Sequence, residues 1–302
     1  MINKAKNNKI KQGVSDRAFN MVLMVIVTIF LLLVLYPLIY VVSSSFSSGT
    51  AVTTGMVLLW PVEFSFTGYE IVFSHRGVWT GYLNSIFYTI VGSFINVLMV
   101  ILTAYPLSRR DYSCRGGLTL YFAIPMFVGG GLIPTYILVS NLHLVNTRWV
   151  ILLMGALNLS NMIIMRTFFQ TSIPKELLES SKMDGISDFG YLMKIVIPLS
   201  KASISVILLY SVVGHWNSYF IPMIYLRSNE LYPLQLVLRE ILSATSVDMS
   251  QITDAELYSQ MVGQADTMKY SLIVVATVPM LVIYPFVQKF FEKGVMIGSV
   301  KG

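Results

Sequence analysis

Charged residues interrupt this chain so rarely that six uncharged stretches are long enough to cross a lipid bilayer. A membrane-spanning helix needs about 20 predominantly apolar residues. The six stretches lie between these flanking residues: Arg17 and Glu63, Arg76 and Arg109, Arg115 and Arg148, Arg148 and Arg166, Lys201 and Arg227, and Lys269 and Lys289. The apolar run 21–42 in the first stretch would measure roughly 33 Å as a helix, about one hydrocarbon core. The sequence therefore predicts an all-α membrane protein with six transmembrane helices in contact with membrane lipid.

The composition supports this class. Hydrophobic residues make up 55% of the chain and charged residues only 12%, whereas a soluble domain carries about 25% charged residues. The same balance excludes a disordered chain, which would be poor in apolar residues. The single cysteine, Cys114, excludes an intrachain disulfide and a thiolate metal cluster. The histidines lie far apart without ligand spacing, so we expect no metal site: they are His75, His143 and His215.

The first apolar run could instead belong to a cleaved signal peptide, because five basic residues precede it. It is longer than a signal-peptide core of about 7–15 residues, and no clean cleavage site follows. We therefore expect a retained helix and one six-span domain at 19–292, between tails at 1–18 and 293–302. The expected spans are about 19–46, 81–108, 117–140, 149–166, 202–226 and 270–290.

The distribution of positive charge predicts the orientation in the membrane. With six spans both termini lie on one side, and that side carries 16 of the 21 basic residues. Basic residues concentrate on the cytoplasmic side of membrane proteins. We therefore expect both termini in the cytoplasm and a multi-pass protein of the cytoplasmic membrane. The net charge of +6 then reflects topology, and no nucleic-acid partner is needed to explain it.

Two long connections differ in character. The external connection 227–269 is acidic: it holds Glu230, Glu240, Asp248, Asp254, Glu256 and Asp266 against three basic residues. It is either a solvated loop over the helix ends or a docking surface for an extracytoplasmic partner, and its charge alone does not separate these interpretations.

The cytoplasmic connection predicts a short helix after Pro174, which suits a first helical turn. Thr171 and Ser172 offer oxygen atoms to cap this helix. Glu176 lies near the positive end of the helix dipole. Gly185 is expected to end the helix as the residue just beyond its C-cap.

A second short helix is expected after Ser187, a plausible N-cap. Its apolar residues have helical spacing: Phe189, Leu192, Met193 and Val196. Pro198 is expected to end it. Such a pair of helices on the membrane surface either inserts into a partner protein or is an interfacial segment that re-enters the membrane.

The same segment resembles the EAA loop of the permeases of binding-protein-dependent ABC importers. The family pattern is E-A-A, three residues, G, nine residues, and I-x-L-P. Here ESSKMDG at 179–185 is followed at the same spacing by IVIP at 195–198. The Glu, Gly, Ile and Pro are kept. Ser180 and Ser181 replace the alanines, and Ile197 replaces the leucine.

Two further stretches resemble carbohydrate permeases of the maltose type. They are WNSYFIP at 216–222 and FEKGVMIGSVKG at 291–302, the latter being most similar to a Gram-positive subgroup that imports complex oligosaccharides or aldouronate-like sugars. The resemblance covers nearly the whole chain from the first span. It implies a type I ABC importer permease fold in a bacterial membrane. It also implies a second homologous permease, two ATP-binding subunits and an extracytoplasmic sugar-binding protein as partners.

The resemblance further implies that 170–198 is a coupling segment that docks into an ATP-binding subunit. The residues expected to act there are Glu176, Glu179, Ser180, Ser181, Asp184, Gly185 and Pro198. The chain contains no G-x-x-x-x-G-K-[ST] motif, whose backbone would hold nucleotide phosphates. We therefore expect no enzymatic activity and no cofactor of its own, with ATP and magnesium bound by the partner subunit.

The predicted spans hold only neutral polar groups, which disfavours ion-coupled transport but suits the hydroxyl groups of a sugar. The candidate pathway residues are Asn158, Asn161, Ser211, His215, Trp216, Asn217 and Tyr219. Each has an alternative role in helix contacts or at the membrane interface. The glycines at 129–131 predict a break in the third span, which is either a hinge, a cavity lining or a kink.

The sequence thus predicts the permease subunit of an ATP-driven importer that moves a carbohydrate, an oligosaccharide, by alternating access. A permease for a non-sugar solute is the first alternative, but a charged solute would favour charged residues in the spans. A non-transporting membrane anchor or sensor subunit is the second, but it would not need a coupling loop.

Overall fold

The computed structural model describes residues 13–248 and 255–298. Over these residues the chain is helical and has no β-strand, which confirms the predicted all-α class. Parts of the predicted tails, 1–12 and 299–302, and residues 249–254 of the predicted external loop lie outside the described residues.

The chain divides into two compact units, Met1–Glu70 with Ile252–Val274 and Ile71–Gln251 with Val275–Gly302. The first unit contains α1 (Val14–Ser45) and α2 (Gly49–Thr53). Two further helices begin in it and continue into the second unit: α3 (Thr67–Ser74) and α15 (Ala255–Gly298). Serines at the end of α1 hold the following loop: Ser43 Oγ donates to the Leu59 carbonyl at 2.7 Å.

Two glycines let α2 and α15 approach closely within the first unit. A Cβ added to Gly49 would lie 2.5 Å from the carbonyl carbon of Gly263. Real Cβ atoms do not come that close to backbone, so glycine is required for this contact.

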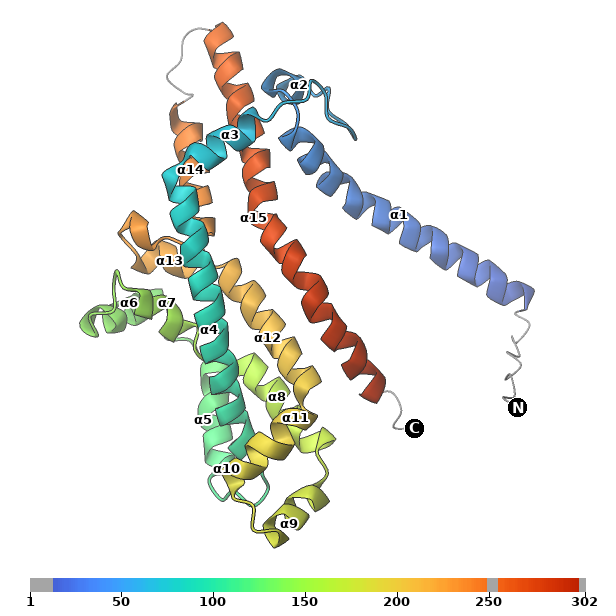
Figure 1. The fold of residues 1–302 in the computed structure, drawn as a ribbon, viewed down its shortest axis with the longest axis vertical. Helices are drawn as coiled ribbons and strands as arrows, with labels where there is room; N and C mark the ends of the chain where they lie inside the picture. The colour runs from blue at the N-terminus through green and yellow to red at the C-terminus, as the bar shows by residue number, and fades with distance from the viewer. Residues whose placement is uncertain (1–12, 249–254, 299–302) are drawn as a thin grey trace. The chain divides into compact units, whose positions relative to one another are not determined.

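The second unit is built around α4 (Arg76–Ser108), against which α8, α12 and α14 pack (Figure 1). These three helices are α8 (Leu159–Ser172), α12 (Lys201–Trp216) and α14 (Leu234–Asp248). Where α8 and α12 meet α4 there is a buried apolar cluster, which includes Val100 and Ala104 of α4, Met162 and Met165 of α8, and Ile207 of α12. Lipid tails are as apolar as these side chains, so close packing rather than water exclusion holds such helices together.

Three helices in the described residues are each long and apolar enough to cross a membrane: residues 15–45, 76–108 and 262–285. Three bent helix pairs bring the number of candidate spans to six if each pair is one span. They are α5 (Arg115–Phe127) with α6 (Leu132–Asn141), α7 (Arg148–Met154) with α8, and Asp188–Leu199 with α12. The pairs bend by 117°, 42° and 82°, in that order.

The largest of these bends lies at the predicted glycine break. Gly131 has φ of +80°, a conformation that residues with a side chain rarely adopt. Pro134 follows in the first turn of α6, where its missing N–H costs no hydrogen bond. The break is therefore a sharp turn of the chain between two short helices.

Much of the expected external loop is helical. It contains the 3₁₀ turn Asn229–Leu231 and α14. The short helix α13 (Phe220–Tyr225) precedes it, within the expected fifth span. Leu234, Leu236 and Val237 of α14 are buried. This connection is thus a helix folded onto α4 rather than only a solvated loop. The last helix, α15, also begins within the connection.

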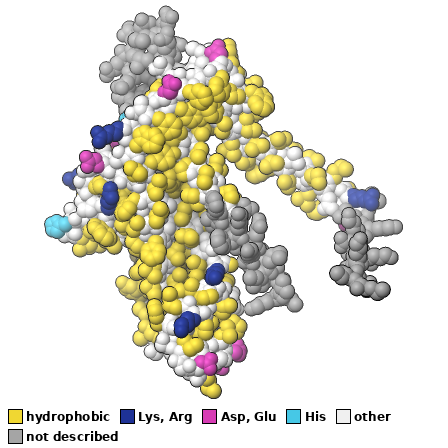
Figure 2. Space-filling model, in the orientation of Figure 1, with side chains coloured by type: hydrophobic (Ala, Val, Ile, Leu, Met, Phe, Trp, Pro, Cys, Tyr) yellow, Lys and Arg dark blue, Asp and Glu magenta, His cyan; other side chains and the backbone are white. Residues whose placement is uncertain are grey.

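Most of the face in view carries hydrophobic side chains, which run along α4 with few charged ones between them (Figure 2). Exposed apolar residues of this kind are expected where a protein meets lipid rather than water.

Candidate functional site

The first short helix expected in the coupling segment is α9 (Lys175–Met183), which ends at a glycine as expected. Gly185 has φ of +72°. Its N–H donates to the Lys182 carbonyl at 3.1 Å, and the Ile186 N–H donates to the Ser181 carbonyl at 2.9 Å. These two bonds satisfy carbonyls that the helix end would leave unpaired, and they require the left-handed residue between them.

The start of α9 differs from the expectation. Pro174 is the N-cap residue, and no side chain caps the helix. Thr171 and Ser172 belong to the last turn of α8, where Thr171 Oγ1 donates to the Thr167 carbonyl at 3.0 Å. The prediction that these two residues cap α9 was wrong, because a helical threonine can satisfy its hydroxyl on its own preceding turn.

The second helix of the segment starts where expected but does not end where expected. Ser187 Oγ accepts from the Gly190 N–H at 3.2 Å, which confirms the predicted cap. The helical path continues through α10 (Asp188–Tyr191), the π-helical turn Leu192–Val196 and α11 (Ile197–Leu199).

Pro198 therefore lies inside this path, and the sharp bend comes at Ser200. The prediction that Pro198 ends the helix was wrong. The proline ring would crowd the preceding turn of an α-helix, and the wider π turn just before it offers more room there.

Most residues expected to couple to a partner are exposed. They are Glu176, Glu179, Ser180, Asp184, Gly185 and Pro198. Ser181 is instead buried, and its hydroxyl donates to the Leu178 carbonyl at 2.8 Å. A serine whose hydroxyl is satisfied in this way fits the small buried position that alanine takes in the resembled pattern. Three large apolar side chains of the segment face outward: Met183 is 89% exposed, Phe189 66% and Met193 50%.

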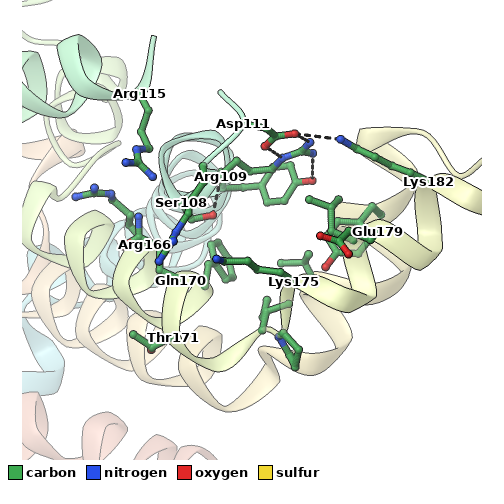
Figure 3. A pocket seen from close by; sticks show the side chains of 18 residues that line it. Ser108, Arg109, Asp111, Arg115, Arg166, Gln170, Thr171, Lys175, Glu179 and Lys182 are labelled. Carbon is green, nitrogen blue, oxygen red and sulfur yellow. Dashed lines mark hydrogen bonds and ion pairs between the residues drawn. The ribbon is translucent and has the colours of Figure 1, made fainter. Parts of the chain in front are cut away.

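Ion pairs join this segment to the end of α4. Nothing in the sequence indicated these pairs. Arg109, just beyond α4, pairs with Asp111 at 2.5 Å and with Asp188 of α10 at 2.5 Å. Lys182 of α9 pairs with Asp111 at 3.1 Å. The Arg109 guanidinium holds the pKa of Asp111 well below its usual range. Figure 3 shows Asp111 between Arg109 and Lys182.

A second feature is a polar cavity of about 430 Å³ among the helices of the second unit. Four of the seven predicted pathway residues line it: Asn158, Asn161, Ser211 and His215. Its wall also includes Asn96, Ser160, Tyr210 and Ser218, which sequence reasoning did not select. Each is a single polar residue in a largely apolar segment, and nothing in the sequence indicated that they would lie around one cavity. The cavity wall holds no Asp, Glu, Lys or Arg.

His215 enters this wall because two glycines leave room for its ring. A Cβ added to Gly155 would lie 2.6 Å from His215 Nε2, and one added to Gly92 would also collide with the ring. Nδ1 lies 2.9 Å from the Ser211 carbonyl, so Nδ1 carries the proton and Nε2 is an acceptor.

Two acceptors in this wall have no partner in the described part of the chain, His215 Nε2 and Asn96 Oδ1. The amide nitrogen of Asn96 already donates to the Gly155 carbonyl at 2.9 Å. Buried polar atoms are normally satisfied. These two acceptors have almost no accessible surface, so they are buried behind the cavity wall.

The other three predicted pathway residues do not line the cavity. Trp216 is buried, and its Nε1 donates to the Ala276 carbonyl of α15 at 3.1 Å, so its role in the structure is packing. Asn217 donates to the Val213 carbonyl at 2.9 Å. The ring of Tyr219 lies 5.3 Å from the Arg239 guanidinium carbon. A pathway role for these residues stays a prediction.

Comparison with known proteins is consistent with this architecture. Residues 76–297 match the family described as the binding-protein-dependent transport system inner membrane component. The polygalacturonan/rhamnogalacturonan transport system permease protein YtcP of Bacillus subtilis is 37% identical over 95% of this chain and 99% of its own length. Protein LplC of Bacillus subtilis is 36% identical over 88% of this chain and 89% of its own length.

A solved structure is similar over nearly the whole chain. It is the crystal structure of a bacterial ABC transporter involved in the import of the acidic polysaccharide alginate. The alignment has a TM-score of 0.82 and 35% identity, and it covers 94% of this chain and all of the other. This chain therefore has the type I ABC importer permease fold and belongs to the family of binding-protein-dependent transport system inner membrane components.

Proposed function

We propose that this chain is the permease subunit of an importer that moves a carbohydrate, an oligosaccharide, across the cytoplasmic membrane by alternating access. ATP hydrolysis in a separate subunit would drive the change between inward-open and outward-open states. The chain itself would cleave no bond, and ATP and magnesium would bind to the partner. This proposal rests mainly on the segment α9–α11, whose short helices expose an apolar surface.

The exposed surface of that segment fits a protein partner. Met183 and Phe189 lie near the turn at Gly185 and project apolar side chains outward. Apolar anchors with a polar rim are typical of protein interfaces. We infer that an ATP-binding subunit covers them, with Glu179 as a polar contact at the rim.

The ion pairs of Arg109 give this surface a mechanical role. They join α9 and α10 to the end of α4, the central helix of the second unit. A movement imposed on α9 by the ATP-binding subunit would therefore be passed to α4. The bound state of the ATPase could then bias a two-state equilibrium in the permease.

The substrate class follows from the polar cavity and from the relatives. A cavity with amide, hydroxyl and imidazole groups and no charged side chain suits a ligand rich in hydroxyl groups. Relatives of this chain are named as transport permeases for polygalacturonan/rhamnogalacturonan and for galactooligosaccharides. Carbohydrate is the class that these names share.

The remaining partners follow from the family. A second homologous permease would complete the pathway, two ATP-binding subunits would bind on the cytoplasmic side, and a sugar-binding protein would deliver cargo outside. Both termini would lie in the cytoplasm, as the distribution of basic residues indicates.

The test is ATPase activity in proteoliposomes that contain this chain with its partner permease, ATP-binding subunits and binding protein. Candidate oligosaccharides should stimulate hydrolysis, and Glu179→Ala and Gly185→Pro should abolish the stimulation while the complex still assembles. Glu70→Ala, at an exposed glutamate of α3 far from this segment in sequence, is the matched control. Stimulation that persists in both α9 variants would contradict the coupling role.

A further inference from the structure

A cavity of about 640 Å³ lies where the ends of α4, α5 and α8 meet α9. Its wall is strongly cationic. Six basic side chains line it against two carboxylates, those of Asp111 and Glu179; the basic residues are Arg109, Arg110, Arg115, Arg166, Lys175 and Lys182. Figure 3 shows Arg115 and Arg166 on one side of the cavity and Lys175 and Glu179 of α9 across from them.

Only part of this positive charge is neutralised by the protein. Arg109 and Lys182 pair with aspartates. Within the described residues, no carboxylate lies at ion-pair distance from Arg110, Arg115 or Arg166. Like charges that share a partly enclosed wall repel one another, so the arrangement is suited to an anion between them.

The side chains present favour a phosphate group. Arg166 uses Nε to donate to the Leu107 carbonyl at 3.1 Å, which orients its guanidinium and leaves the two terminal nitrogens for another acceptor. Guanidinium groups bind phosphate oxygens in pairs and in a fixed plane. Arg115 and Lys175 can add donors from α5 and α9 to the same group.

The helix that carries Arg115 offers an apolar surface to lipid beside the cavity. Arg115 is the first residue of α5, a helix without a buried residue. Beyond it, Leu120, Tyr121 and Ile124 are 63%, 67% and 51% exposed. Ile124 lies nine residues from Arg115, a rise of roughly 13 Å along a helix. With about 100° of rotation per residue, these three residues lie on the side of α5 opposite Arg115. The helix that contributes Arg115 to the cavity thus also faces lipid, which favours a phosphate of lipid origin.

We propose that this cavity binds the phosphate headgroup of an anionic phospholipid of the cytoplasmic leaflet. The assignment of the leaflet rests on the orientation given with the proposed function. Basic pockets between membrane helices on that side are suited to anionic headgroups. A phosphate held there joins α5 and α8 to α9, so the lipid stabilises the position of the coupling segment.

The test is a direct binding measurement on the detergent-purified complex with its partner permease and ATP-binding subunits. Native mass spectrometry counts bound phosphatidylglycerol during titration, with phosphatidylcholine and inorganic phosphate as the other probes. The pocket variant is Arg110→Gln with Arg115→Gln. The matched control is Lys194→Gln with Lys201→Gln, which removes the same charge from exposed residues outside the cavity.

We expect the pocket variant to weaken phosphatidylglycerol binding on the order of 30-fold, since each basic residue at a membrane surface contributes roughly fivefold. The control variant should bind like the unmodified complex, phosphatidylcholine should bind more weakly, and inorganic phosphate should not displace the lipid. If the double variant does not assemble, Arg115→Gln alone should weaken binding roughly fivefold.

Equal binding by the pocket and control variants would overturn the proposal. Displacement by inorganic phosphate at the lipid's own concentration would assign the site to free phosphate and overturn the lipid as ligand, and equal binding of phosphatidylcholine would show that anionic charge is not recognised. The measurement uses neither ATP nor sugar. Its failure is therefore distinct from failure of the transport proposal.

Discussion

Lys182 Nζ lies 3.1 Å from Asp111 Oδ2, and the same carboxylate lies 2.5 Å from Arg109. Asp111 is thus the common partner of a residue at the end of α4 and a residue on α9. Because Arg109 also pairs with Asp188 of α10, both short helices of the coupling segment are held to α4 by one small cluster of charges.

Removing this shared carboxylate should uncouple the segment more than it destabilises the protein. Asp111 and Lys182 are 44% and 52% exposed, and exposed ion pairs contribute only about 0.2–1 kcal/mol each. We expect Asp111→Asn to lower Tm slightly and to reduce sugar-stimulated ATP hydrolysis severalfold. ATPase assays and thermal unfolding of the reconstituted complex measure the two effects. Glu70→Gln is the control, and equal stimulation in Asp111→Asn would refute the mechanical role of this carboxylate.

The same cluster should be insensitive to pH in the physiological range. Arg109 lowers the pKa of Asp111, so the contribution of this group to stability is complete above the ordinary aspartate pKa of about 3.9 and is lost only as the pH falls below it. We expect the difference in Tm between the unmodified complex and Asp111→Asn to be constant between about pH 5.5 and 8. A difference that shrinks within this window would contradict the assigned ion pair.

The turn at Gly185 should not accept a side chain. Its φ of +72° is in the left-handed region, where an alanine costs roughly 1–2 kcal/mol. Gly185→Ala should therefore lower Tm by a few degrees and weaken coupling. Gly116→Ala is the control, because Gly116 lies in α5, its φ is not in the left-handed region, and a Cβ there would meet nothing within 4 Å. Equal effects of the two substitutions would contradict the strained-turn argument.

The position of the His215 ring depends on the absence of a side chain at Gly155. A Cβ there would lie 2.6 Å from Nε2, so Gly155→Ala must displace the imidazole or the neighbouring helix at a cost of about 1–3 kcal/mol. We expect transport of the substrate to fall tenfold or more with only a moderate loss of stability. Counterflow or uptake into proteoliposomes measures it.

Gly214→Ala serves as the comparison for that experiment. Gly214 lines the same cavity, but a Cβ there would meet nothing within 4 Å. If both alanine variants transport equally well, the position of the His215 ring does not matter for the pathway.

The features that could be predicted from the sequence depend on composition or on residues close together in the chain. The scarcity of charge predicts a helical membrane protein because uncharged stretches of this length have no other stable environment. The turn at Gly185 and the cap at Ser187 were also predictable, because each depends on residues within one or two helical turns.

Tertiary structure decided which side chains meet. Arg109 and Asp188 are 79 residues apart in the chain, and nothing in the sequence around either residue indicates that they pair. His215 and Trp216 are adjacent and were predicted to share one role, yet His215 lines the cavity and Trp216 packs against α15.

The reason is geometric. Successive residues of an α-helix point about 100° apart, so a polar motif read along the chain is divided among different faces. Which face borders a cavity depends on where neighbouring backbones can approach, as at Gly92 and Gly155. The sequence by itself determined the class of protein and the local form of the coupling segment. The packing of α4, α7, α8, α12 and α13 decided the composition of the polar cavity.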